Sequence, residues 1–158
     1  MTRIEESDFR PLDEFPLKWR WTDSRWNELR ADALHGIRPF TESKARELSQ
    51  YSLTFSDAYG LSESQFENIS RVEAMAGSPG VREWLSACHA EPDQWVVVSW
   101  DHRHAVLVRW NMFCEYWDDF CYPASDDVTV WPPCEEWALV YLHHGEFVFG
   151  ERRGSVAA

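Results

Sequence analysis

Apolar residues in the first half of the chain recur every three or four positions, which is the spacing of one face of a helix. This spacing predicts four helices, over residues 22–36, 38–55, 62–77 and 78–92. Thr41 can cap the second helix, and Gly77 can end the third. Trp26 is expected to face inward from the first helix. The apolar side of the third helix would consist of Phe66, Ile69, Val72 and Ala76.

The second half changes to short β-branched and aromatic runs separated by turn residues, a pattern typical of strands. Strands are predicted over residues 94–100, 105–110, 127–131, 136–142 and 147–150. Between the second and third strands, residues 111–120 return to helical spacing. These elements predict an α+β fold, with N-terminal helices packed on an antiparallel sheet of about five strands and one helix inserted between strands.

We expect a single domain over residues 1–158, with frayed ends near 1–8 and 152–158, because a chain of 158 residues suits one hydrophobic core. Both periodic patterns direct a set of apolar side chains into this core. The predicted core residues are Trp95, Val97, Val106, Val108, Trp110, Trp117, Phe120, Leu139 and Phe149.

Composition and charge narrow the classes of function. The chain is 44% hydrophobic and holds ten tryptophans, which excludes a disordered protein. Its net charge is −12, from 15 Lys and Arg against 27 Asp and Glu, and this sign repels nucleic acid and anionic lipid and attracts basic proteins. Residues 1–15 lack the apolar segment of a signal peptide, and no apolar run is long enough to cross a bilayer. We therefore predict a cytoplasmic protein with four free thiols that binds neither nucleic acid nor membranes.

Acidic residues are segregated toward the end of the chain. No Lys or Arg occurs between Arg109 and Arg152. This interval holds nine acids: Glu115, Asp118, Asp119, Asp126, Asp127, Glu135, Glu136, Glu146 and Glu151. Like charges repel one another, so their segregation favours a surface complementary to a cationic protein. The alternative is that arginines of the helical half fold over these acids and neutralise them.

The first predicted function is that of a non-catalytic protein-binding domain, in its most concrete form an immunity or antitoxin-like neutraliser of a basic toxin. Its partner-binding residues are predicted to be Asp118, Asp119, Tyr122, Asp126, Asp127, Trp131, Glu135 and Glu136. Tyr122 and Trp131 would be the anchors. Because loop carboxylates contribute little to stability unless they cap a helix, reversal of Asp126 and Asp127 is expected to leave the fold intact.

The alternative function is that of a small metal-dependent hydrolase. His102 and His104 lie at alternate positions of one predicted hairpin and His143 lies at another, so these side chains and Asp126 could surround a divalent metal. Hairpin tips also collect polar residues simply because they are exposed to water. Convergence of these four side chains on one point would favour the hydrolase over the binding domain.

No cofactor is predicted. The chain contains no G-x-S-x-G, no phosphate-binding loop and no G-x-G-x-x-G motif. Cys114 and Cys121 would be separated by about 10 Å along one helix, at ~1.5 Å per residue, which is too far to share a zinc ion bound at ~2.3 Å from each sulfur. We therefore expect no structural metal site.

Several motifs resemble those of a small bacterial family of tryptophan-rich, uncharacterised proteins. They comprise Pro11–Glu14 with Lys18–Trp19, Ile37–Thr41, the aromatic residues Trp110, Phe113, Trp117 and Phe120, and Phe149–Arg152. This resemblance implies no catalytic residues. The chain is also similar, more weakly, to SUKH-type immunity proteins, which are acidic α+β domains with a Trp-Asp-His sequence near a strand end, here Trp100–His102. The second resemblance implies a protein partner.

Overall fold

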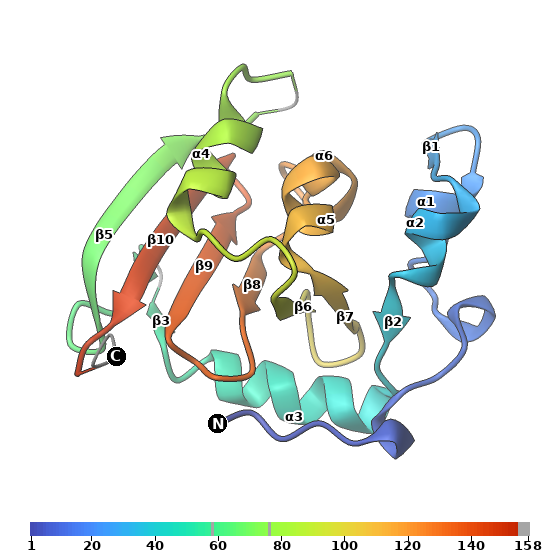
Figure 1. Ribbon diagram of the computed structural model, residues 1–158, viewed down its shortest axis with the longest axis horizontal. Helices are drawn as coiled ribbons and strands as arrows, with labels where there is room; N and C mark the ends of the chain where they lie inside the picture. The colour runs from blue at the N-terminus through green and yellow to red at the C-terminus, as the bar shows by residue number, and fades with distance from the viewer. Residues whose placement is uncertain (58, 76, 155–158) are drawn as a thin grey trace.

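A seven-stranded sheet forms the centre of the computed structural model, which describes residues 1–57, 59–75 and 77–154 (Figure 1). Its strand order is β2-β7-β6-β8-β9-β10-β5, and every pair is antiparallel. In that order the strands are Arg38–Pro39, Ala105–Arg109, Trp95–Ser99, Val128–Trp131, Trp137–Leu142, Glu146–Arg152 and Phe66–Glu73. The α+β class and the antiparallel sheet are confirmed. The sheet has seven strands rather than about five, because β2 and β5 extend it at its two edges.

Strand β5 occupies the place of the helix predicted over residues 62–77, so that prediction is wrong. β5 pairs with β10 along its whole length and contains a β-bulge. Ser70 lies opposite Phe149 and Glu67 opposite Glu151, so three steps along β5 match two steps along β10. One residue of β5 is therefore extra, and it changes which side of the sheet the following side chains face.

The bulge explains the first helix-like interval of β5, whereas Val72, the next apolar residue, packs on the other face of the sheet. Asn68 takes a left-handed backbone conformation there, with a φ of 52°. The extra residue brings Phe66 and Ile69 onto the same face of the sheet although they are three positions apart, as on a helix. Ala76, the last member of the predicted apolar stripe, lies outside the described residues.

The helix predicted over residues 22–36 is interrupted near its start. The chain instead forms α1 (Trp19–Thr22), a tight turn, β1 (Asn27–Glu28) and α2 (Ala31–His35). Asp23 closes the turn, because its carbonyl accepts from the amide of Trp26 and its carboxylate from the amide of Arg25, both at 2.9 Å. These local bonds compete with a helix and leave Trp26 61% exposed, whereas helical spacing would direct it inward.

The other predicted helices are present with altered ends. Thr41 caps α3 (Glu42–Ser52) by accepting a hydrogen bond from the amide of Lys44 at 3.2 Å, as predicted. The fourth helix is α4 (Val81–Cys88), and the inserted helix is divided at Tyr116. Its two parts are α5 (Trp110–Glu115) and α6 (Trp117–Phe120). The remaining elements are η1 (Glu6–Asp8), η2 (Leu12–Glu14), β3 (Ser56–Asp57) and β4 (Gly60–Leu61).

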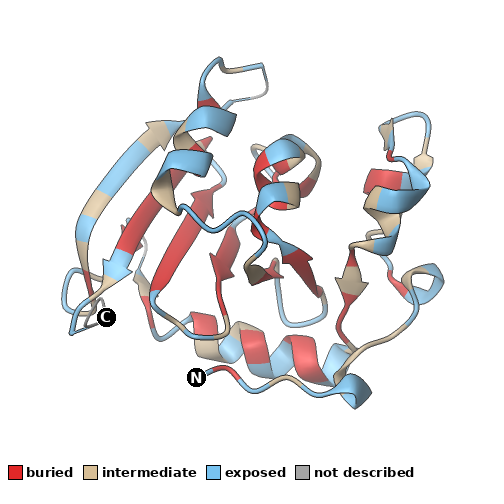
Figure 2. Cartoon of the chain, viewed as in Figure 1, coloured by how far each residue is buried: buried red, intermediate tan, exposed pale blue. Residues whose placement is uncertain are grey.

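The sheet separates two hydrophobic clusters. On one face α1, α4, α5 and α6 cover Val96 and Val98, and on the other α3 and the β3–β4 hairpin cover Val97. Figure 2 shows buried residues along the central strands and at helical intervals along α3. Of the predicted core residues, Trp95 is only half-buried, against the α3 side, and the other eight are buried. Within the described part of the chain, no helix has both the length and the hydropathy needed to cross a membrane.

Thr2, near the start of the chain, is bonded to the β8–β9 region. The amide of Thr2 donates to the carbonyl of Pro133 at 2.8 Å, and its hydroxyl donates to Glu135 at 2.6 Å. The same hydroxyl accepts from the indole nitrogen of Trp131 at 3.0 Å. Thr2 is therefore 8% exposed, whereas Met1 is 93% exposed, and the expectation of a frayed start stays a prediction. At the other end, Arg152 belongs to β10, and residues 155–158 lie outside the described part.

Candidate partner-binding surface

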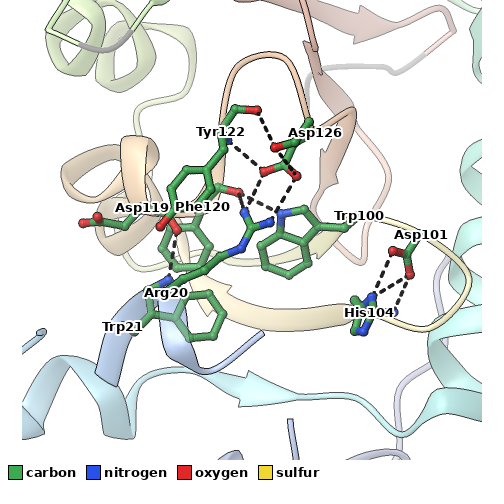
Figure 3. Close-up of polar contacts among 10 residues, drawn as sticks. Arg20, Trp21, Trp100, Asp101, His104, Asp119, Phe120, Tyr122 and Asp126 are labelled. Atoms are coloured by element: carbon green, nitrogen blue, oxygen red, sulfur yellow. Dashed lines mark hydrogen bonds and ion pairs between the residues drawn. The ribbon is translucent and has the colours of Figure 1, made fainter. Parts of the chain in front are cut away.

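A buried ion pair between Arg20 and Asp126 fixes the segment that joins α6 to β8, residues 121–127. The guanidinium of Arg20 donates to both carboxylate oxygens of Asp126, at 2.6 and 3.1 Å (Figure 3). Arg20 also donates to the carbonyl of Phe120 at 3.3 Å, and Asp126 accepts from the amide of Tyr122 at 2.8 Å. Both residues are buried, so the pair holds the two ends of this segment together.

Aromatic rings surround the guanidinium of Arg20. It lies 4.3 Å from the ring centroid of Tyr122, 5.3 Å from that of Trp19 and 5.7 Å from that of Trp100. Its Nε has no hydrogen-bond partner among the described residues. Attraction between a cation and these ring faces compensates part of the cost of burying the charge. The buried guanidinium of Arg20 thereby supports the rings of Tyr122 and Trp19 from the interior of the protein.

Three aromatic residues, Trp19, Trp26 and Tyr122, form what we call the aromatic patch. The ring centroids of Trp19 and Trp26 are 5.1 Å apart, and those of Trp26 and Tyr122 are 6.3 Å apart with the rings stacked. Trp19 and Tyr122 are half-buried, whereas Trp26 is exposed. An exposed Trp packed on two half-buried aromatic rings is a feature that interaction sites share.

Two carboxylates of α6 lie beside the aromatic patch. Asp119 accepts a hydrogen bond from the amide nitrogen of Asn27 at 2.7 Å, and Asp118 is exposed. Burial raises the pKa of Asp119. The negative charge of Asp118 raises this pKa further, whereas the hydrogen bond from Asn27 lowers it. Among the described residues, no Lys or Arg forms an ion pair with either carboxylate. The α6 side of the patch is therefore acidic, whereas Lys18 and Arg25 flank its other residues.

The other residues of the predicted surface have different positions. Trp131 is fully buried and Asp126 is 7% exposed, so neither side chain lies at the surface as the predicted contact with a partner requires. Asp127 is exposed and accepts from the amide of His143 at 2.9 Å. Glu135 and Glu136 lie in the β8–β9 turn, at the opposite end of β8 from Asp127. Asp118, Asp119 and Tyr122 thus lie close together in α6 and the segment after it, whereas Asp127 contacts His143 and Glu135 and Glu136 lie apart.

Neutralisation of the nine acids by the rest of the chain is partial. Arg20 pairs with Asp126, Arg71 pairs with Glu146 at 2.9 Å, and the amino group of Met1 pairs with Glu135 at 3.2 Å. In the described part of the chain, the other six have no Lys, Arg or amino-terminal partner. They are Glu115, Asp118, Asp119, Asp127, Glu136 and Glu151.

The residues of the alternative hydrolase do not meet. His104 contacts Asp101 at 2.9 Å, His143 contacts Asp127 at 3.1 Å, and Asp126 is occupied by Arg20. Across residues 1–57, 59–75 and 77–154, no group of three His, Cys, Asp or Glu side chains could hold a metal ion. In the described part of the chain, the four residues predicted for the hydrolase therefore do not form one shared metal site.

Three of the four cysteines, Cys88, Cys114 and Cys121, have thiols whose pKa is raised by burial. All four cysteines are free, as expected. Burial raises the pKa of Cys88 and of Cys114 to about 12, and it also raises the pKa of Cys121. Thiols of this kind are protonated near neutral pH, and the protonated form is a poor nucleophile.

Sequence reasoning missed Arg20, Trp19 and Trp26. Arg20 and Asp126 are 106 positions apart in the chain, and Asn27 and Asp119 are 92 apart. A search for local sequence patterns therefore could not pair them. One local signal indicated that Trp26 is exposed. Residues 23–25 are Asp, Ser and Arg, and this sequence favours a turn as well as the start of a helix.

Comparison of the chain with models of known protein families, with curated proteins and with solved structures finds no match. The resemblances to the tryptophan-rich bacterial family and to SUKH-type immunity proteins therefore stay predictions. The function is argued below from the surface itself.

Proposed function

We propose that the protein is a non-catalytic binding domain whose aromatic patch, with its acidic border, docks on a basic partner protein. One observation carries the proposal: Trp26 is 61% exposed and stacked on Tyr122, beside the carboxylates of Asp118 and Asp119 that have no basic partner in the described part of the chain. Trp and Tyr are the residue types that dominate binding energy in protein interfaces.

The arrangement suits the capture of arginine and lysine side chains. An aromatic face attracts a cation by about 0.5–2 kcal/mol, depending on how far the contact excludes water. Carboxylates at the border add charge-assisted hydrogen bonds and accelerate association with a positive surface. The patch is also held in shape before binding, because Arg20 and Asp126 fix Tyr122 from within. Rigid side chains lose less conformational entropy when a complex forms.

The most concrete form of this proposal is an immunity or antitoxin-like protein that covers the cationic site of a toxin. Its net charge of −12 supports a basic partner and disfavours nucleic acid as a direct ligand. Genes of such proteins commonly lie beside those of their toxins, so the product of the adjacent gene is the first candidate partner.

Photo-crosslinking tests the proposal. A photoreactive amino acid replaces Ser24, an exposed residue in the turn beside Trp26, in cells that naturally make the protein. We expect one basic protein to be crosslinked, and Trp26→Ala to weaken its affinity by about thirtyfold, or about 2 kcal/mol. The matched control is Tyr59→Ala, because Tyr59 is 80% exposed and belongs to the β3–β4 hairpin. Equal effects of the two variants, or an acidic partner, would contradict the proposal.

A further inference from the structure

The groove between α4 and α5 contains a pocket that the proposed function does not use. The two helices lie side by side over one face of the sheet (Figure 1). Arg82, Ser86 and His89 line the pocket from α4 and the residue after it, at the spacing of one side of a helix. Its volume is about 380 Å³, within the range of ligand pockets. We call this cavity the α4–α5 pocket.

The inner part of the α4–α5 pocket is apolar. Trp110 and Cys114 of α5 line it and are 1% and 4% exposed, so they form its floor. Ala90 and Pro92 line it from the loop after α4. Burial raises the pKa of Cys114 to about 12, so its thiol is uncharged near neutral pH. This part of the pocket suits a small hydrocarbon group, because binding removes apolar surface of both partners from water.

His89 completes the wall of the pocket as a neutral side chain. Burial lowers the pKa of its imidazole, which disfavours the charged form. Its carbonyl accepts from the indole nitrogen of Trp110 at 3.3 Å, which holds the end of α4 against the floor. The Nε2 of His89 is buried and has no hydrogen-bond partner in the described part of the chain. Buried polar atoms are normally paired, so this wall contains a polar atom that the protein itself does not satisfy.

Opposite charges lie at the mouth of the pocket, one on each helix. Arg82 and Glu115 both line it and are exposed. The Nε of Arg82 donates to the carbonyl of Glu115 at 2.9 Å, which joins the two helices and leaves the two Nη atoms of the guanidinium for other partners. Among the described residues, no carboxylate forms an ion pair with Arg82, and no Lys or Arg forms one with Glu115. Each charge is therefore available to a ligand.

We propose that the α4–α5 pocket binds a free α-amino acid with an apolar side chain. The guanidinium of Arg82 pairs with the carboxylate of the ligand, the carboxylate of Glu115 pairs with its ammonium group, and its side chain lies on the apolar floor. A simple anion would be repelled by Glu115 and a simple cation by Arg82, whereas a zwitterion satisfies both. The pocket shares no lining residue with the aromatic patch, so the inference is independent of the proposed function.

Four probes test the two charges separately. Leucine, N-acetyl-leucine, leucine amide and N-acetyl-leucine amide have the same side chain and carry both charges, only the negative one, only the positive one, or neither. Each is titrated into the ¹⁵N-labelled protein, and the amides of Ser86, Ala90 and Asn111 are followed. We expect saturable shifts with leucine, and affinity about tenfold higher than for either singly charged probe, because each charge makes one charge-assisted contact. Glycine, which lacks the apolar side chain, should also bind more weakly than leucine.

The outcomes distinguish a free amino acid from the end of a peptide. If N-acetyl-leucine binds as tightly as leucine, the pocket takes the C-terminal residue of a chain, and the proposal is overturned. If leucine amide does so, the pocket takes an N-terminal residue, which overturns it as well. No saturable shift with leucine, or equal binding of all four probes, would also overturn the proposal.

Variants assign each charge to its residue. Arg82→Gln should remove the preference for leucine over leucine amide, and Glu115→Gln the preference over N-acetyl-leucine. Arg82→Lys keeps the charge but loses the bond to the Glu115 carbonyl, so it should retain the preference that Arg82→Gln loses. The matched controls, Arg30→Gln and Glu63→Gln, change exposed residues outside the pocket and should leave binding unchanged. Equal effects of pocket and control variants, or equal effects of Arg82→Lys and Arg82→Gln, would contradict the two ion pairs.

Discussion

Arg20 and Asp126 are 106 positions apart in the chain, yet their side chains, 6% and 8% exposed, form a bidentate ion pair inside the molecule. Asp127, the next residue, is exposed and accepts from the amide of His143 at 2.9 Å. Two adjacent carboxylates therefore have different roles: the first holds the segment in place from inside the molecule, and the second lies at the surface.

This difference predicts losses of stability of very different size. Asp126→Asn should lower the free energy of unfolding by about 3–5 kcal/mol, because it leaves the charge of Arg20 buried without a counter-ion. Asp127→Asn should cost less than about 1 kcal/mol, since its Oδ1 can still accept from the amide of His143. Urea unfolding of the two variants measures both values. Similar effects would contradict the structural role of Asp126 and restore the expectation that both are ordinary loop carboxylates.

Thr2 should be as important to stability as a core residue. Thr2→Val keeps the shape of the side chain but removes the acceptor of the buried Trp131 indole and the donor to Glu135. An unsatisfied buried donor costs about 1–3 kcal/mol, so the urea midpoint should fall accordingly. The control is Thr54→Val, whose hydroxyl bonds a nearby carbonyl at the surface and should matter little.

Asp119 should destabilise the fold at neutral pH. Burial raises its pKa above the ordinary value of 3.8, so the folded state binds its proton more tightly than the unfolded state. Stability from this group is present below pH 3.8 and is lost as the pH rises through the raised pKa. Asp119→Asn should therefore raise the free energy of unfolding at neutral pH, and this gain should disappear in acid. A loss of stability at neutral pH would mean that the Asn27 hydrogen bond outweighs burial.

Charge and aromatic variants should differ in kinetics. Asp118→Asn should slow association with the partner, and the rate should fall steeply with salt, because exposed charges act by steering and are screened beyond ~8 Å at physiological ionic strength. Trp26→Ala should mainly accelerate dissociation, because it removes a buried contact of the complex. Surface plasmon resonance at several salt concentrations separates the two rates. A salt-independent association rate would contradict electrostatic steering.

The bulge of β5 predicts a preference at position 68. Its φ of 52° suits Asn or Gly, and a β-branched side chain is strained there. Asn68→Val should be less stable than Asn68→Gly by about 1–2 kcal/mol, and both lose the bond to Glu151, so the comparison isolates the backbone. If the two variants unfold together, the bulge does not hold in solution.

The same bulge shows what could be predicted from the sequence. Strands with apolar residues on both faces, such as β6, were recognisable because little else explains a run like Trp95–Val98. β5 was not, because an extra residue gives a strand the spacing of a helix. Nor could local pattern decide between helix and turn at Asp23, where side-chain bonds to two residues ahead determine the outcome.

The candidate site was predictable only in part. The acids come from one interval of the chain, so their segregation was visible and led to Asp118, Asp119 and Asp127. Which of them stay exposed depends on Arg20, which is distant in sequence and close in space. Pairing of this kind is determined by the tertiary fold, so the spacing of residues along the sequence does not reveal it.

The long separation between Arg20 and Asp126 also matters while the chain is being made. At about 5–20 residues per second, residue 20 is synthesised some 5–20 seconds before its partner. The docking of Thr2 on Pro133 is delayed further. During this interval Trp19, Trp21 and Trp26 lie in a nascent segment with nothing to cover them, and we expect chaperones at the ribosome to bind it until the second half of the sheet has emerged.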